Sequence, residues 1–252
     1  MERLLYRFPS LKKAKLKTML MTQTDWLLTE VIENRKEAPL LSSLKLTAVQ
    51  EEARFDFQAG QYVRILTPNG RESIFAMASE PEEKKFLEFL LKDQEGSTAQ
   101  ELCRLRANER LKISLPFGKG YPIERLKGKE VVLIGIGSGI SPLRSLLRSM
   151  LRREHQFEKI ALIYGVRTPE DLPYKSDFNL WRKKIDLHLA ASQPGRSEWS
   201  GFVGRVTHLL PTLSLHPERT RACICGTHAM QEEVTNLLER IGISKENILL
   251  NH

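Results

Sequence analysis

Three glycines at every second position separate an apolar run from a helix-like segment. Gly135, Gly137 and Gly139 follow the consecutive apolar residues 131–134, and Pro142 stands three residues later. Glycine lets the backbone approach a phosphate closely, and proline suits the first turn of a helix, where its missing N–H has no partner to lose. The free N–H groups of such a turn, together with the helix dipole, favour an anion. These residues predict a phosphate-binding turn between a strand and a helix.

The turn departs from the ordinary dinucleotide fingerprint. A proline stands near the place of the third glycine, and the next apolar run, residues 160–164, leads into Gly165, Val166 and Arg167 rather than into an acid for a ribose. A tight connection without a ligand also selects glycine, so a purely structural role stays open. The strand and helix context on both sides favours ligand binding, and the departures argue against a typical dehydrogenase.

Length and composition limit the alternatives. A chain of 252 residues with 41% hydrophobic residues is long enough for two domains and too apolar for a disordered protein. Cys103, Cys223 and Cys225 form neither a paired framework nor a zinc spacing. We therefore expect a reducing, cytoplasmic environment and no structural disulfide.

The net charge of +8 is concentrated at the N-terminus. Residues 1–22 contain six basic residues and only one acid, Glu2; the basic residues are Arg3, Arg7, Lys12, Lys13, Lys15 and Lys17. We interpret this segment as a solvated basic arm, and an organellar presequence is the alternative. Its apolar run is too short for a secretory signal, and no segment approaches the length of a membrane span.

The pattern of the chain changes near residue 126. Before it, short strand-like runs with turn residues between them predict a small antiparallel β-barrel; the runs are residues 26–31, 44–49, 61–66, 74–78, 86–91 and 111–115. After it, apolar runs alternate with helical segments and predict a doubly wound parallel sheet; the runs are residues 131–134, 160–164, 185–190, 222–225 and 248–250, with helices at 142–152 and 228–241. We place the domains at 23–126 and 127–252, with the boundary in residues 125–129.

The motifs, taken in order, resemble the ferredoxin-NADP reductase superfamily. They are GQYV at 60–63, IFAMASEP at 74–81, LPFGKGY at 115–121, GIGSGISPLRS at 135–145, IYGVRTPEDL at 163–172 and ICGTHAM at 224–230. The series covers nearly the whole chain from Trp26. The resemblance implies an N-terminal FAD-binding barrel, a C-terminal sheet that binds NADH or NADPH, and hydride transfer where the two domains meet.

The family's flavin motif is altered in this chain. The register set by Met77, Ala78 and Ser79 places Phe75 where the family has the aromatic residue that stacks on the flavin, and a barrel-core role for Phe75 is the alternative. The family's pyrophosphate-binding arginine falls on Ser73, and its serine near flavin N5 falls on Ala76. The resemblance therefore gives two expectations: Arg71 supplies the phosphate contact, and a backbone N–H serves N5.

A second flavin contact is implied by EGSTAQEL at 95–102. Gly96, Ser97 and Thr98 match the family's short helix, whose N-terminus faces the flavin pyrophosphate. An ordinary helix cap explains the same residues equally well.

The match is closer in the second half. The resemblance implies that Gly135, Gly137, Ser138, Gly139 and Pro142 approach the nicotinamide nucleotide. It also places Cys225, Gly226 and Met230 beside the nicotinamide, with Thr227 in place of the family's proline. The Cys225 thiol is expected to shape the pocket rather than attack as a nucleophile.

Cofactor preference rests on residues that follow the second and third parallel strands. Ser192 fits the family's pattern for a ribose phosphate and Gln193 does not, while Arg167 and Arg196 are further phosphate candidates. We expect a slight preference for NADH. The C-terminal Asn251 and His252 offer no aromatic cover for a flavin, and His252 is expected at the surface.

The chain contains no cysteine cluster for an iron–sulfur centre, so the resemblance implies a separate electron acceptor, such as an acidic ferredoxin or flavodoxin. Two alternatives stay open. The chain is a reductase subunit of a larger complex, or it is a flavin-free nucleotide-binding regulatory or scaffold module. A nucleic-acid role ranks below both, because no recognition motif accompanies the positive charge.

Overall fold

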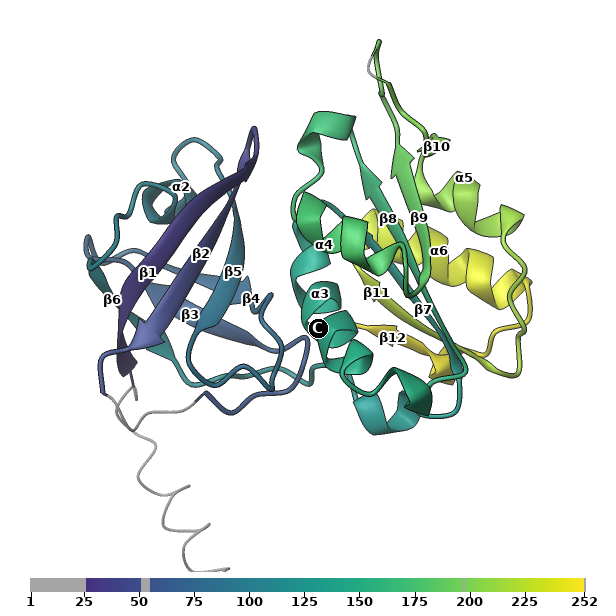
Figure 1. The fold of residues 1–252 in the computed structure, drawn as a ribbon, viewed down its shortest axis with the longest axis horizontal. Helices are drawn as coiled ribbons and strands as arrows, with labels where there is room; N and C mark the ends of the chain where they lie inside the picture. Colours follow the sequence, from purple (N-terminus) through teal and green to yellow (C-terminus); the bar gives the residue numbers. More distant parts are fainter. Residues whose placement is uncertain (1–25, 51–54, 197, 252) are drawn as a thin grey trace, which may run out of the picture.

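The computed structural model describes residues 26–50, 55–196 and 198–251, and within them the chain forms two sheets side by side (Figure 1). The predicted basic arm and His252 lie outside the described residues. The first sheet is antiparallel and the second is parallel, as the sequence predicts. The predicted boundary falls between the last strand of the first sheet, which ends at Ser114, and the first strand of the second, which begins at Glu130.

The first sheet has the strand order β4-β3-β6-β1-β2-β5. Its strands are β1 (Trp26–Ala38), β2 (Leu41–Ala48), β3 (Tyr62–Leu66), β4 (Glu72–Ala76), β5 (Leu87–Lys92) and β6 (Arg110–Ser114). An isolated antiparallel bridge joins Met77, directly after the outermost strand β4, to Phe89 within the other outermost strand β5, so the sheet curls into a barrel. Apolar residues on alternate positions, among them Val63, Ile65 and Leu111, fill the interior.

The second sheet has the order β10-β9-β8-β7-β11-β12, and all its paired strands are parallel. Its strands are β7 (Glu130–Ile136), β8 (Lys159–Val166), β9 (Asp186–Ala191), β10 (Phe202–Val203), β11 (Thr220–Cys225) and β12 (Ile248–Leu250). The order reverses at β7, and ligands of doubly wound sheets bind beyond the carboxyl ends of the strands at such a switch point.

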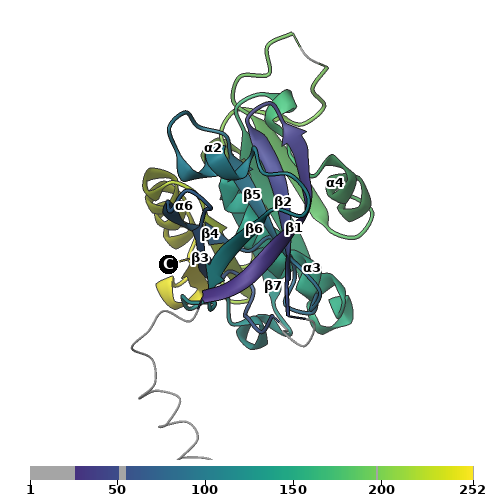
Figure 2. The same cartoon turned by 90° about the vertical axis from the view of Figure 1, so that its left-hand side faces the viewer.

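Helices cover both faces of the parallel sheet. They are α3 (Ile140–Leu151), α4 (Lys175–Trp181), α5 (Val206–Leu209) and α6 (His228–Arg240). The first two pack on the face toward the barrel, and the last two pack on the opposite face (Figures 1 and 2). Successive β7 residues alternate between the two resulting cores, since Leu133 joins the first and Ile134 the second. Within the described part of the chain, no helix has the length and apolar character needed to span a membrane.

One of the three hydrophobic clusters contains residues from both halves. Leu41, Ala59, Ala78 and Leu90 from the barrel half pack in the same cluster as the residues of α3 and α4. The barrel also contains the short helix α2 (Thr98–Leu102). The two halves are therefore packed against each other through α3 (Figure 1).

Candidate functional site

A cavity of about 980 Å³ opens between the two halves of the molecule, at the carboxyl ends of the parallel strands. The barrel contributes an apolar wall; its members include Tyr62, Ile74, Phe75, Ala76 and Leu90. The parallel sheet contributes the glycine turn after β7, the ends of β8 and β9, and the turn after β11. The volume lies at the upper end of the range for ligand pockets, which suits an extended ligand or two ligands side by side.

The glycine turn is shaped by packing as well as by its ligand-facing backbone. Gly137 has a φ of +52° and open space around its α-carbon, whereas a Cβ on Gly139 would lie 2.4 Å from the carbonyl oxygen of Cys225. A Cβ on Gly135 would meet Leu143 at 2.5 Å. Gly137, Ser138, Gly139 and Pro142 line the cavity, and Gly135 does not. One part of the predicted motif thus faces the cavity, and another lets β7, α3 and β11 approach closely.

A buried tyrosine on the neighbouring strand β8 forms a hydrogen bond with this turn. Tyr164 of β8 is fully buried, and its hydroxyl donates a hydrogen bond of 2.8 Å to the carbonyl oxygen of Gly137. Burial raises the pKa of Tyr164 well above its ordinary value, so the hydroxyl keeps its proton and acts as a donor. The turn therefore has a fixed backbone shape.

Cys225 ends β11 and lines the cavity beside Gly226 and Met230. Burial raises the pKa of its thiol to about 11, although a hydrogen bond with the Asn251 side chain acts in the opposite direction. The side-chain oxygen of Asn251 is buried and has no hydrogen-bond partner among the described residues. A neutral thiol and a free amide oxygen thus stand together at the junction of the two halves.

The other end of the cavity contains charged side chains. Arg167 and Ser192, two of the predicted phosphate contacts, line it, whereas Arg196 is exposed and does not. Asp171 also lines this end, and its carboxylate lies 3.8 Å from the guanidinium of Arg167. Arg205, directly before α5, lines the same end and was not expected from the sequence.

The predicted flavin residues fall into three places. Phe75 and Ala76 line the cavity, and Phe75 also packs against the barrel core. Ser73 of β4 does not line the cavity, and the residues after the strand, Met77, Ala78 and Ser79, are fully buried behind it.

The third place lies away from the cavity. The Arg71 guanidinium donates to the carbonyl oxygens of Gly96 and Ser97, so the structure brings Arg71 together with the predicted pyrophosphate loop. The Ser97 hydroxyl caps α2 by accepting from the N–H of Gln100 at 3.1 Å, and Thr98 begins that helix. The helix-cap interpretation of these residues therefore holds in the structure.

Sequence reasoning also left many residues of the cavity wall unassigned, and Tyr62, Thr227 and Asn251 are three of them. Tyr62 was visible within GQYV, but nothing in the sequence indicated that its ring faces the cavity. Thr227 caps α6 through a hydrogen bond from the N–H of Met230 at 3.4 Å, a role typical of threonine before a helix. Asn251 follows the short final strand and gives no signal of its own in the sequence.

Fold and site together define a class of protein: two-domain chains that join an antiparallel barrel to a doubly wound parallel sheet, with a cavity between them. Residues 133–236 match the family model of the oxidoreductase NAD-binding domain. The chain is 28% identical to the F subunit of the Na(+)-translocating NADH-quinone reductase of Mannheimia succiniciproducens over 88% of its own length, and it spans 66% of that relative. It is 24% identical to the sulfhydrogenase 1 subunit gamma of Pyrococcus furiosus, over 78% of this chain and 68% of the relative.

Solved structures with this fold include a ferredoxin reductase of carbazole 1,9a-dioxygenase, with a TM-score of 0.80 and 23% identity over 92% of this chain and 70% of that one. A ferredoxin NADP+ reductase from Neisseria gonorrhoeae with bound FAD and NADP gives a TM-score of 0.77 and 21% identity over 90% of this chain and 98% of that one. The fold that the resemblance implied is confirmed: the chain has the ferredoxin-NADP reductase-like fold, and its parallel half matches an oxidoreductase NAD-binding domain over residues 133–236.

Proposed function

We propose that this chain is an FAD-dependent reductase that takes hydride from a nicotinamide nucleotide and passes electrons to a separate acceptor. The observation that carries the proposal is the shared cavity, whose one wall is the apolar barrel surface and whose other wall is the glycine turn with Cys225. FAD, when bound, supplies the hydride acceptor and the means of passing electrons on. The protein's task is then to hold two flat rings against each other and to keep water away.

The barrel wall fits the ring system of a flavin. Ile74 lies on the cavity wall and is 57% exposed, so a flat ligand in the cavity would cover it. Tyr62 and Phe117 meet edge to face, with ring centroids 5.3 Å apart, and form part of the same aromatic surface. We propose that Phe75 and the backbone of Ala76 contact the ring, as the family resemblance implies.

Arg71, beside the altered flavin motif, is our candidate for the cationic residue that binds the pyrophosphate of FAD. Arg71 already lies at the loop of Gly96 and Ser97, where it contacts carbonyl oxygens. We propose that Arg71 turns from these carbonyls to the pyrophosphate and that Thr98 adds a hydroxyl donor. A charge-assisted hydrogen bond to phosphate is stronger than one to a neutral carbonyl, which favours the exchange.

We propose NADH as the preferred reductant. Asp171 lines the far end of the cavity beside Arg167 and partly neutralises it. A carboxylate there suits ribose hydroxyl groups and opposes a 2′-phosphate. Ser192 and Arg205 favour the phosphate instead, so the preference for NADH is modest.

An acidic electron-transfer protein is the acceptor that the net charge favours. Five of the eight excess positive charges belong to residues 1–22, which lie outside the described residues, so the remaining surface is only mildly basic.

The two relatives are both named as subunits, which supports a second candidate, in which this chain is the reductase component of a complex. A partner that stays bound through purification of the native protein would favour that candidate. The three free cysteines support a reducing, cytoplasmic location for either.

The test is the visible absorption spectrum of purified protein supplied with FAD, followed by anaerobic addition of NADH or NADPH. We expect bound flavin that NADH bleaches at lower concentration than NADPH. The Arg71→Gln variant should bind FAD about 10- to 100-fold more weakly, because a hydrogen bond to a charged group contributes about 1.5–3 kcal/mol. Arg110→Gln is the matched control, since Arg110 is an exposed barrel arginine that pairs with Glu30 at 3.1 Å. Protein that binds nicotinamide nucleotide but no FAD would contradict the proposal and favour the scaffold alternative.

A further inference from the structure

Arg144 is a buried cation in contact with both halves of the molecule. It belongs to α3, two residues after Pro142, and is only 5% exposed. Its Nη1 donates to the carbonyl oxygen of Ala78 at 2.8 Å and to the carboxylate of Glu88 at 3.0 Å, both in the barrel half. Its Nε donates to the carboxylate of Asp177 at 2.6 Å, in α4 of its own half. One side chain therefore ties three segments together.

Tyr174, which contacts Arg144, forms a second link between the two halves. The guanidinium carbon of Arg144 lies 4.1 Å from the centroid of the Tyr174 ring, which is buried. Tyr174 has a φ of +51°, a left-handed conformation that bulky residues rarely adopt, and its N–H donates to the carboxylate of Glu37 at 3.0 Å, near the end of β1. The surrounding contacts hold this residue in a strained conformation, which is a sign that its placement is closely determined.

The position of Arg144 relates it to both walls of the cavity. Ala78, whose carbonyl it binds, is two residues from Ala76 on the barrel wall. On the other side, Gly139 and Pro142 line the cavity directly before it on the same turn and helix. A change in the Arg144 contacts would therefore displace one wall relative to the other.

We propose that Arg144 is a positioning residue that sets the alignment of the barrel wall with the glycine turn, and so the alignment of the two bound rings. The proposal rests on the proposed function for its catalytic consequence, although the alignment itself is a property of the protein alone. An arginine suits the task because its rigid fork reaches several acceptors at once, which a lysine cannot do in the same plane.

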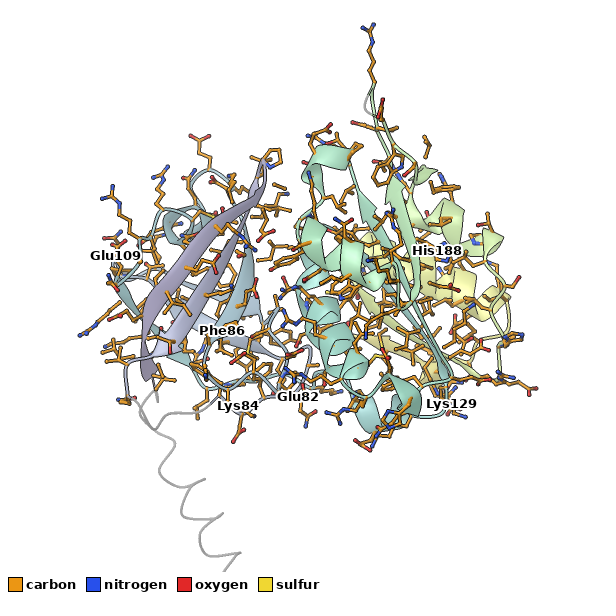
Figure 3. The ribbon with its side chains drawn as sticks, in the orientation of Figure 1. Glu82, Lys84, Phe86, Glu109, Lys129 and His188 are labelled. Atoms are coloured by element: carbon orange, nitrogen blue, oxygen red, sulfur yellow. The ribbon has the colours of Figure 1, made fainter. Side chains whose placement is uncertain are left out.

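The charge balance supports a persistent contact. Burial opposes the charged form of Arg144, but the neighbouring Tyr174, Glu88 and Asp177 raise its pKa above the ordinary value, so the cation is kept. Removing one member of such a buried group leaves the others uncompensated. A second ion pair between the halves, Arg153 with Glu82, lies at the far end of α3 and is about one-third exposed, and Figure 3 shows Glu82 between the barrel and α3.

The experiment compares Arg144→Gln and Arg144→Lys with Arg153→Gln, which also removes a contact between the halves but away from the cavity. Two quantities are measured: hydrogen exchange of residues 76–80 and 172–178 without cofactor, and the rate of flavin reduction at saturating NADH. We expect faster exchange in both segments for Arg144→Gln and a kcat at least about tenfold lower with a nearly unchanged KM, because a misalignment near 1 Å costs up to about a hundredfold. Arg144→Lys should restore part of the rate, and Arg153→Gln should behave as the native protein.

Native exchange and native kcat in Arg144→Gln would overturn the proposal, and so would an equal effect of Arg153→Gln. A native chain that binds no flavin would refute the proposed function, while the exchange measurement would still decide the alignment. If Arg144→Gln does not fold, Glu88→Gln removes only the negative charge of one of the two acceptors in the barrel half, and the Ala78 carbonyl stays in place. This variant should then show the same changes to a smaller degree, and native behaviour of that variant would overturn the proposal.

Discussion

The Cys225 thiol lies on the wall of the cavity, and its protonation state determines its reactivity toward alkylating reagents. With a pKa of about 11, only about 0.1% of it is thiolate at pH 8. We predict that iodoacetamide labels Cys225 slowly near neutral pH and about tenfold faster for each unit of pH up to about 10. Bound NAD+ should slow the labelling, because Cys225 lines the cavity. Peptide mapping by mass spectrometry separates Cys225 from Cys103, and Cys225→Ser is the control; rapid labelling at pH 7 would contradict the prediction.

At the residue scale, the sequence identified those cavity residues that belong to a local motif. Gly137, Ser192 and Cys225 line the cavity as the motifs indicated. Arg205 and Asn251 were missed because they reach the cavity only through the order of strands in space. Arg71 and Gly96 are 25 residues apart, and only the family resemblance, which assigned both to the flavin pyrophosphate, indicated that they lie together.

At the scale of the element, the turn from β7 to α3 uses glycine for two reasons: Gly139 allows close packing, and Gly137 allows a positive φ. We predict that Gly139→Ala lowers the free energy of unfolding by about 3 kcal/mol, because the new methyl group would meet the backbone of β11 and overpack it. Gly137→Ala should cost only about 1 kcal/mol, since the cost is the strain of a positive φ with open space around it. Its methyl group projects from a residue that lines the cavity, so NAD+ affinity should fall instead.

Urea denaturation and calorimetric titration with NAD+ measure the two effects. Similar stability of the two variants would show that the packing of Gly139 against β11 is not what selects glycine there.

The elements themselves were largely predictable because each long strand shows its burial in its pattern. Continuous apolar runs gave β7, β8 and β11, and the helix predicted at 228–241 matches α6 to within one residue. The two-residue strand β10 and the short helices α4 and α5 were missed. Such short segments have no periodicity of their own and are held in place by packing against the larger sheet.

At the scale of the whole molecule, the two halves meet through paired charges as well as apolar contacts. Glu80 is 3% exposed and accepts from Arg148 at 3.3 Å and from Arg152. Burial acts to raise the pKa of Glu80, but the two arginines outweigh it and leave the pKa below the ordinary 4.5. A carboxylate with a lowered pKa stabilises the fold above about pH 4.5, and that contribution disappears as the pH falls through its value in the folded protein.

We predict that the free energy of unfolding decreases as the pH falls from about 5 to about 3 and that Glu80→Gln removes part of this slope. The variant should also lose about 1 kcal/mol at pH 7, because it removes the charge that pairs with two arginines whose side chains are 32% and 54% exposed and stay partly hydrated. Urea denaturation followed by tryptophan fluorescence measures both. Glu95→Gln, at an exposed position, is the control. An unchanged pH slope in Glu80→Gln would exclude Glu80 as a source of acid sensitivity.

The contact between the halves was the least predictable feature. Arg144, Arg148 and Arg152 repeat every four residues along α3, a pattern that usually indicates a solvated helix face. Here that face meets glutamates some 56 to 72 residues earlier in the chain. Neither segment alone indicates that the other will neutralise it.

The order in which these charged residues are added during translation has a consequence for the nascent chain. The barrel can close once β6 pairs with β1, which requires residues up to Ser114, whereas Arg144 is added 30 residues later. At a synthesis rate of about 5–20 residues per second, Glu80 and Glu88 wait roughly 1.5–6 s for their partner helix. During that interval they remain hydrated carboxylates on the surface that α3 will later cover. Those two charges keep part of this surface hydrated, although Leu41 and Leu90 on the same surface stay uncovered until α3 arrives.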